Sequence, residues 1–283
     1  MQWTLVILCL LTPAGCAWFP RHSLPPPDPP LTVLVGPVTL TAPVTSPSDL
    51  YTFGQDPSHE TAPQLLTQLI DETEVTGQRL LTEQMARQSG FIVIPFPDAR
   101  RLQTNDPTIA KSQDPEALRT LGQQAQADVV LTGHVVDYGV VRWQYWVSGL
   151  LVSMLTETLI VGAASGFNPV IMAATAGSEL LTDLPVWWGG AYMAGWALRP
   201  VRVTVEAWNV RGCAAKPWKE EAVVVLIPGW TLKKIPPDER RRKEVQLALN
   251  LSQAMTEIAD NVGKAMRLSP CTSPELGRRE DSP

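Results

Sequence analysis

The stretch Ala127-Asp-Val-Val-Leu-Thr-Gly-His-Val-Val-Asp-Tyr-Gly139 decides the fold class of this chain. It contains Val129, Val130, Leu131, Val135 and Val136, and β-branched residues at this density favour an extended strand over a helix. Apolar residues occupy odd and even positions alike, so both faces of the strand have to be covered. We therefore predict a strand in the middle of a sheet, with packed layers on both sides.

The segments that precede this strand alternate between strand and helix patterns. Residues 31–40 and 91–96 are short apolar runs typical of strands. Residues 64–89 carry apolar side chains at helical spacing, interrupted by Gly77, which predicts one long helix or two. Residues 114–126 begin with Asp-Pro-Glu, a typical helix start. This order of strand, helix, strand, helix, strand predicts an α/β fold with a central sheet flanked by helices.

Several single residues and one polar segment support more local expectations. Pro37, after Gly36, indicates a bend or an edge position in the first strand, and Gly90 is expected to end the long helix in a left-handed conformation. Residues 98–113 are polar and are expected to form a loop with about one turn of helix. Asp128 is expected to cap the end of the preceding helix, and Asp137 to turn the chain.

The chain returns to the same body after residue 199. Residues 200–210 alternate between apolar and polar side chains, which predicts a half-exposed antiparallel strand, and 221–227 are expected to pair back. Residues 236–239, Pro-Pro-Asp-Glu, are expected to start a final helix. The buried stripe of this helix is predicted to contain Val245, Ala248, Leu249, Ser252, Met255, Ala259 and Val262.

Part of this pattern resembles a known group of proteins. A helix ending in residues 122–126, followed by Ala-Asp, an aliphatic run and Thr-Gly in 127–133, resembles the CsgG-type lipoproteins. Related folds occur in LpoB-type lipoproteins, which activate peptidoglycan synthases, and in the N-terminal domain of TolB. Residues 89–93 and 33–38 resemble two further strands of this group, and Trp218 resembles the residue that opens its return strand. The resemblance implies a role in the assembly, secretion or regulation of an envelope complex.

The first 16 residues have the layout of an export signal. Residues 5–11 are apolar and are followed by Ala14, Gly15 and then Cys16. This layout resembles a bacterial lipoprotein signal, in which Cys16 becomes the lipidated (palmitate-carrying) first residue. A plain cleaved signal and an unprocessed apolar tail are the alternatives. Because Ala17 follows the cysteine, the resemblance implies a lipid anchor in the cell outer membrane, with the protein facing the periplasm.

Composition divides the rest of the chain into further segments. Residues 17–31 are rich in proline and are expected to form an extended tether. The α/β body is expected in two parts, 32–139 and 200–268, and a disordered polar tail in 269–283. The remaining part, residues 140–199, is an apolar insertion.

Charged side chains are rare in this insertion: between Trp143 and Leu198 they are Glu157, Glu179 and Asp183. Three interpretations are open: two buried helices or a helical cap on the sheet, a region that faces a membrane or other subunits, and a transmembrane hairpin. The run 146–164 is long enough to span a bilayer. The residues expected to make membrane or subunit contacts are Trp143, Trp146, Leu150, Leu151, Leu155, Leu159, Trp187, Trp188 and Trp196.

A breaking point and a small-residue stripe shape the insertion further. Asn168 and Pro169 interrupt the apolar run, so a second helix is expected to begin there. Gly149, Ser153, Thr156 and Ala163 form a stripe of small residues that permits close packing of helices.

The sequence predicts no catalytic, cofactor or metal site. Nucleophilic catalysis needs a Ser or Cys beside a His, and His134 is expected to be packed within the central strand and bonded to a neighbour. No CxxC pair or glycine-rich phosphate loop is present, and the net charge of −5 argues against nucleic acid as a partner. Cys213 and Cys271 could form one disulfide in an oxidising compartment, although no pattern places them within bridging distance.

Taken together, these observations predict a non-enzymatic, membrane-anchored envelope lipoprotein that acts in assembly, secretion or scaffolding. Its expected partners are the membrane, through Cys16, and other envelope proteins, which could include further copies of itself. Two alternatives are open. One is a soluble periplasmic monomer that serves as an adaptor or regulator of an envelope enzyme. The other is a hydrolase or transferase that uses Glu157, Glu179 and Asp183.

Overall fold

The structure is a computed structural model of the 283-residue chain. Cys16, Trp188, Cys213, Cys271, the signal segment and the C-terminal tail lie outside the described residues, so the expectations on them are not addressed by the structure. The described residues are 27, 29–54, 57–105, 114–140, 142–187, 192–193, 196–210, 217–225, 231 and 233–268.

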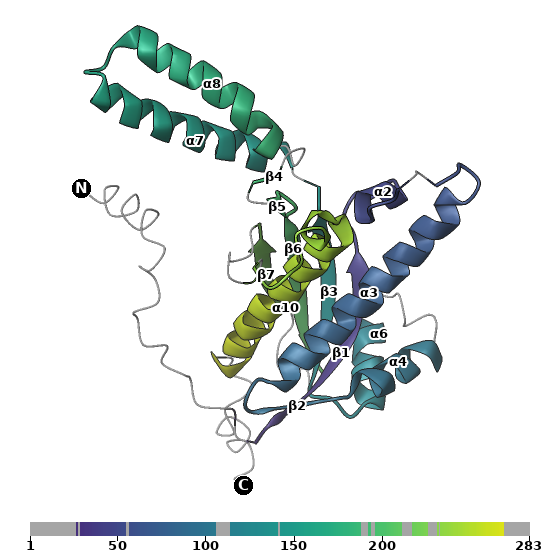
Figure 1. Cartoon of the computed structure of the whole chain (residues 1–283). Helices are drawn as coiled ribbons and strands as arrows, with labels where there is room; N and C mark the ends of the chain where they lie inside the picture. The colour runs from purple at the N-terminus through teal and green to yellow at the C-terminus, as the bar shows by residue number, and fades with distance from the viewer. Residues whose placement is uncertain are drawn as a thin grey trace.

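A five-stranded mixed sheet forms the centre of the α/β body (Figure 1). β1 runs parallel to β2 and β3, whereas β6 is antiparallel to β3 and β7. The predicted α/β class and the central place of the 127–139 stretch are confirmed. In spatial order the strands are β2 (Phe91–Val93), β1 (Leu31–Leu40), β3 (Val129–Tyr138), β6 (Val201–Asn209) and β7 (Trp218–Val224).

Helices cover both faces of this sheet. On one face, α3 (Ala62–Ala86) packs over β1 and β2, and α10 (Lys243–Leu268) packs over β6 and β7. On the other face, α4 (Phe96–Asn105) contacts β1, and α6 (Pro115–Gln124) contacts β3 and β6. The short helix α2 (Pro47–Leu50) lies against α3 and α10. The sheet therefore separates two hydrophobic cores.

The two cores explain the sequence of β3. Val129, Leu131 and Val135 belong to the larger core under α3 and α10, while Val130 belongs to the smaller core under α4 and α6. All four side chains are fully buried or nearly so. Because successive side chains of a strand point to opposite faces, a strand between two cores needs apolar residues at odd and even positions alike.

The expectation of a polar loop at residues 98–113 was wrong in its first part, where α4 forms from Phe96 to Asn105. Only Ala99 and Gln103 of this helix are buried. They lie four residues apart, on one face of the helix. A helix that buries so narrow a stripe has too few apolar residues to show helical periodicity.

Asp128 does not cap the preceding helix as expected. The end of α6 is closed by its backbone: Gln126 has φ 53°, and the N–H of Ala127 donates to the carbonyl of Gly122 at 2.8 Å. Asp128 is buried, and its Oδ2 accepts a hydrogen bond from the N–H of Thr32 at 2.8 Å. Asp128 therefore has a structural role, as expected, but this role is to join the start of β1 to the start of β3.

Two glycines hold the positions where the chain bends. Gly90 has φ 86°, as predicted, but it lies beyond the helix, which ends at Ala86, and it leads into β2. The strand register shifts between Val35 and Val38, which confirms a bend at Gly36 in an interior strand. A Cβ atom at Gly36 would lie 3.0 Å from the carbonyl oxygen of Leu131.

The C-terminal part keeps the predicted elements but shifts two details. The return strand β7 begins at Trp218, earlier than expected, and a short 3-10 helix, η1 (Glu239–Arg241), precedes α10. Ala248, which was predicted to be buried, is exposed, whereas Met255, Ala259 and Val262 are buried as predicted. The side chains that α10 buries in the core are Leu247, Leu251, Ala254, Met255, Ile258, Ala259, Val262 and Met266.

Candidate functional site

The insertion between β3 and β6 is a helical hairpin that stands out from the α/β body (Figure 1). It consists of α7 (Trp143–Ala164) and α8 (Pro169–Trp187), which pack side by side. The mainly helical insertion predicted for residues 140–199 is confirmed. Two short strands, β4 (Tyr192–Met193) and β5 (Trp196–Ala197), pair with each other before β6 begins.

The hairpin turns at Asn168, as the sequence indicated. Gly166 and Phe167 have φ angles of 64° and 59°, and the N–H of Phe167 donates to the carbonyl of Gly162 at 2.6 Å. Asn168 Oδ1 accepts a hydrogen bond from the N–H of Val170 at 3.0 Å. These bonds close the end of α7 and the start of α8 within the turn itself.

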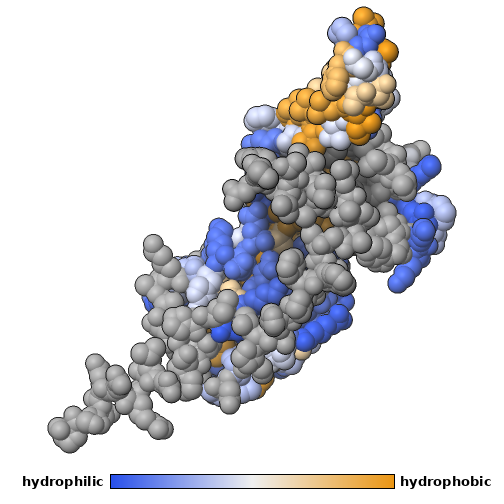
Figure 2. Space-filling view, turned by 90° about the vertical axis from the view of Figure 1, so that its left-hand side faces the viewer, coloured by the Kyte–Doolittle hydropathy of each residue, from blue (hydrophilic) through white to orange (hydrophobic). Residues whose placement is uncertain are grey.

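The first helix of the hairpin, α7, is apolar on all sides and is exposed along most of its length. Within the described residues, the span Trp146–Ala164 is the one helix long and apolar enough to cross a membrane, and 11% of it is buried. Figure 2 shows the hairpin as a largely orange projection at the top of the molecule. A helix with no polar face is stable where its surroundings are apolar. The alternative of two buried helices or a cap on the sheet does not match this exposure, and the alternatives of a membrane-facing or subunit-facing hairpin stay predictions.

The residues predicted to contact a membrane or a subunit have different exposures. Trp146 is half-buried, Leu150 is buried, and only the backbone of Trp187 and Trp196 is described. The predicted contact residues with exposed side chains are Trp143, Leu151, Leu155 and Leu159.

Three carboxylates meet where the two helices of the hairpin face each other. One oxygen each of Glu157, Glu179 and Asp183 lies within 4.8 Å of the other two. Ser153 Oγ donates to Asp183 Oδ2 at 2.5 Å. The hydrogen bond with Glu157, together with the nearby charge of Asp183, raises the pKa of the Glu179 carboxyl. The structure thus brings together the carboxylates that the sequence offered for an enzymatic alternative.

This carboxylate cluster can share protons or attract a cation. Carboxylate oxygens at this spacing are ligands that a divalent cation accepts. Asp183, however, already accepts a hydrogen bond from Ser153, and the Glu157–Glu179 hydrogen bond needs a proton between two acids. Residues 142–187 contain no histidine or cysteine, so neither helix offers a nucleophile paired with a histidine base.

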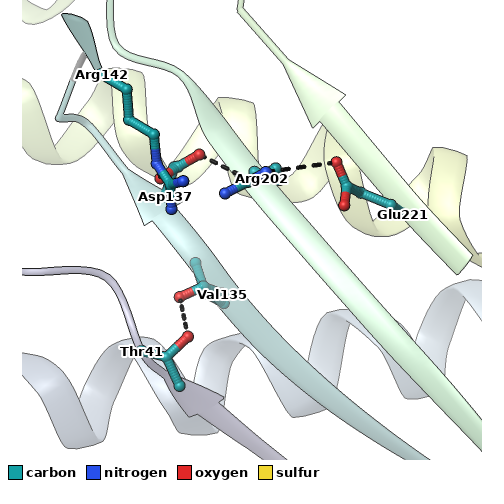
Figure 3. A network of polar contacts seen from close by, with 6 residues as sticks. All are labelled: Thr41, Val135, Asp137, Arg142, Arg202 and Glu221. Atoms are coloured by element: carbon teal, nitrogen blue, oxygen red, sulfur yellow. Dashed lines mark hydrogen bonds and ion pairs between the residues drawn. The ribbon is translucent and has the colours of Figure 1, made fainter. Parts of the chain in front are cut away.

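A buried ion-pair network holds the base of the hairpin (Figure 3). Asp137, at the end of β3, has 2% of its side chain exposed. Arg142 Nε, at the N-terminus of α7, donates to Asp137 Oδ1 at 2.6 Å, and Arg202 Nε on β6 lies 2.8 Å from Oδ2. Arg202 Nη1 also lies 3.7 Å from Glu221 on β7. The sequence indicated Asp137 as a turning residue but not its partners, of which Arg142 lies five residues further along the chain and Arg202 on a distant strand.

Backbone and amide hydrogen bonds tie both ends of the insertion to the body. The N–H of Gly139 donates to the carbonyl of Pro200 at 2.8 Å, so the chain leaves and re-enters the sheet at one place. Asn250 Nδ2 on α10 donates to the carbonyl of Arg199 at 2.6 Å, and Arg199 Nε donates to Gln246 Oε1 at 3.1 Å. These hydrogen bonds therefore hold the base of the hairpin in place on the α/β body.

The face of α7 toward the body carries small residues. A groove of about 520 Å³ separates them from Leu198 and Val225. Gly149, Ser153 and Thr156, three members of the predicted small-residue stripe, line this groove. Most of the large aliphatic side chains of the hairpin lie elsewhere on its surface.

His134 is packed within the sheet, as expected. It is half-buried, and its Nδ1 lies 2.9 Å from the hydroxyl oxygen of Thr39. Burial lowers the pKa of the imidazole, and this effect outweighs the opposing charge of Glu206. The histidine is therefore a structural residue of the central strand.

Comparison with known proteins does not place the chain in a family. No protein-family model matches it, and no curated protein matches it. Among solved structures, it is similar to the crystal structure of lipoprotein GNA1162 from Neisseria meningitidis. The two chains are 11% identical with a TM-score of 0.30, and the match covers 72% of this chain and 92% of that chain. A likeness of this size carries no argument about function, and the resemblance to CsgG-type lipoproteins stays a prediction.

Proposed function

We propose that this protein is a lipid-anchored envelope protein that works through contacts of its α7–α8 hairpin and catalyses no reaction. In this proposal Cys16 carries the lipid, the anchor lies in the outer membrane, and the body faces the periplasm. The hairpin contacts the membrane or other envelope proteins, including further copies of this chain. The role is assembly, secretion or scaffolding.

The observation that carries this proposal is the exposure of an apolar hairpin on a body that already has two closed cores. The sheet and its four flanking helices bury the large aliphatic residues of both cores without using α8. An exposed apolar surface of this kind is a mark of a contact site for protein or membrane. The carboxylate cluster is the competing feature, but residues 142–187 contain no histidine or cysteine to act beside it.

The lipid anchor can be tested by labelling cells with radioactive palmitate. Wild-type protein is expected to incorporate the label and to fractionate with the outer membrane, whereas Cys16→Ser loses both properties. Cys213→Ser is the matched control and keeps both, because in this proposal Cys213 carries no lipid. Equal labelling of wild type and Cys16→Ser would contradict the proposal.

A further inference from the structure

We propose that the tip of the hairpin, residues 159–178, inserts into the same membrane leaflet that holds Cys16. The protein then binds the membrane at two points, through the lipid on Cys16 and through the hairpin tip. This inference rests on the proposed function because it takes the Cys16 anchor as given. It adds the identity of the hairpin's partner, which is bilayer lipid, and the depth to which the hairpin enters.

The side chains of the tip favour lipid over a protein partner. Residues 159–178 contain no charged side chain. Apolar side chains are exposed on both helices and on the turn between them, and a protein partner would cover one face only. Lipid surrounds the tip on all sides. The exposed large apolar residues of the tip are Leu159, Ile160, Phe167, Val170 and Ile171.

Three hydroxyl groups of the tip already have partners inside the hairpin. Ser165 Oγ donates to the carbonyl of Gly162 at 3.2 Å, and Thr175 Oγ1 donates to the carbonyl of Ile171 at 3.0 Å. Ser178 Oγ donates to the carbonyl of Thr175 at 2.8 Å. A polar group that enters hydrocarbon is costly only when it lacks a hydrogen-bond partner. These bonds therefore remove an obstacle to insertion.

The carboxylates set the depth of insertion at one leaflet. From Glu157 to the end of α7 the helix rises about 10 Å, and from the start of α8 to Glu179 it rises about 15 Å, at about 1.5 Å per residue. Half of a hydrocarbon core of about 30 Å is about 15 Å. A one-leaflet tip leaves Glu157, Glu179 and Asp183 at the membrane surface, whereas a full crossing would place all three in hydrocarbon at high cost.

The tether is long enough for the anchor and the tip to share one leaflet. β1 begins beside β2, at the opposite end of the sheet from the hairpin (Figure 1). The ten residues of β1 span about 33 Å at about 3.3 Å per residue. Cys16 lies 15 residues before Leu31, which corresponds to about 46 Å of extended chain at about 3.1 Å per residue. The tether therefore reaches back to the base of the hairpin with about 13 Å to spare. The hairpin leans away from the strand direction (Figure 1), so the length of α7 up to Glu157 adds only in part to the distance that the tether has to cover.

The test uses a polarity-sensitive fluorophore on the tip of the full-length lipidated protein. Cys213 and Cys271 are replaced by Ser, and Ser165→Cys then carries an NBD group. The protein is reconstituted into vesicles of phosphatidylethanolamine and phosphatidylglycerol, and brominated lipids report depth by quenching. NBD emission is expected to rise severalfold and shift to the blue relative to a Lys219→Cys probe on β7.

Matched variants separate lipid insertion from other causes. Leu159→Asp on the tip is expected to abolish the NBD signal, whereas Ile92→Asp on β2 keeps it, although both side chains are 58% exposed. Deletion of residues 25–30 leaves a tether of nine steps, about 28 Å, which is shorter than the sheet. This deletion is expected to abolish the signal while palmitate labelling continues, and insertion of six extra tether residues keeps the signal.

Each outcome of this test supports or overturns the inference. If the protein incorporates palmitate but the NBD group on its tip stays in water, the inference is overturned and the proposed function stays intact. If the blue shift of the NBD emission is lost when the protein is diluted at constant lipid concentration, a second copy of the chain covers the hairpin. This outcome also overturns the inference. A full signal with the shortened tether overturns attachment to the same leaflet. Absence of palmitate on Cys16 overturns the proposed function itself.

Discussion

At the scale of single residues, buried polar groups carry specific structural tasks. Asp137 joins three segments of the chain through two guanidinium groups, and His134 pairs with Thr39 inside the sheet. A buried group with a fixed partner is sensitive to the loss of that partner, because it keeps the cost of desolvation without the compensating contact.

Asp137→Asn is expected to lower the free energy of unfolding by about 3 kcal/mol, because it leaves Arg142 and Arg202 without their carboxylate. The half-exposed pair Arg79–Glu83 provides the control: Glu83→Gln is expected to cost less than about 1 kcal/mol. Urea unfolding followed by circular dichroism measures both values. Equal costs for the two variants would mean that the network in Figure 3 contributes no more than a surface pair.

His134 is expected to make stability depend on pH. Because burial lowers its pKa in the folded protein below the ordinary value of 6.5, the unfolded chain takes up a proton first as the pH falls. With respect to His134, the free energy of unfolding therefore has its highest value above pH 6.5. It declines as the pH falls from 6.5 through the lowered pKa of His134. His134→Gln should flatten this slope in urea titrations, while His59→Gln in the loop before α3 should keep it. A slope that persists in His134→Gln would assign the effect to another group.

At the scale of elements, helix α6 shows how closely a helix approaches the sheet. A Cβ atom at Gly122 would lie 2.4 Å from Val210 Cγ2 and 2.8 Å from Val130 Cγ2. Both distances are shorter than van der Waals contact, so α6 can lie at its present distance only with glycine at this position. The helix and the strand pair under it are thereby held in one register.

Gly122→Ala is expected to cost about 1–3 kcal/mol of stability, because the added methyl group forces α6 away from Val130 and Val210. Gly54→Ala is a suitable comparison, since a Cβ atom there meets nothing within 4 Å. Thermal unfolding of both variants measures the difference. Equal melting temperatures would show that the smaller core yields to the extra methyl group without cost.

At the scale of the whole molecule, the body and the hairpin are separable units joined at one place. The hydrogen bond between Gly139 and Pro200 brings the two ends of the insertion together. The cores contain the helices that flank the sheet, and α8 contributes no buried residue to either of them. The stability of the body should therefore be largely independent of the hairpin.

Replacing residues 141–198 with a short Gly-Ser loop tests this separation. The variant is expected to unfold cooperatively, with a strand and helix signal in circular dichroism, and to stay monodisperse without detergent once residues 1–16 are removed. The intact chain without residues 1–16 is expected to need detergent or lipid, because it keeps the exposed apolar hairpin. Size-exclusion chromatography with and without detergent compares the two. A variant that aggregates or fails to fold would show that the hairpin belongs to the core.

The sequence by itself determined the elements, because local patterns encode them. Apolar residues at odd and even positions of the 127–139 stretch required a central strand, helical spacing indicated α3, and Asn168 ended the first apolar run of the insertion. These signals depend on side-chain period and turn chemistry within a few residues, which a single segment contains in full. Helix α4 was not predicted because its narrow buried stripe has too few apolar residues to produce such a pattern.

Only the tertiary structure decided which of these elements meet and which face water. The sequence pattern of an apolar helix is the same whether the helix is buried in a core or exposed. The exposure of α7 therefore depended on where the fold places this helix. The meeting of Glu157 with Glu179, and of Asp137 with Arg202, depends on helix packing and strand pairing between distant segments. The buried face of α10 was likewise set by the sheet it covers. Long-range packing fixes such contacts, and no local period records them.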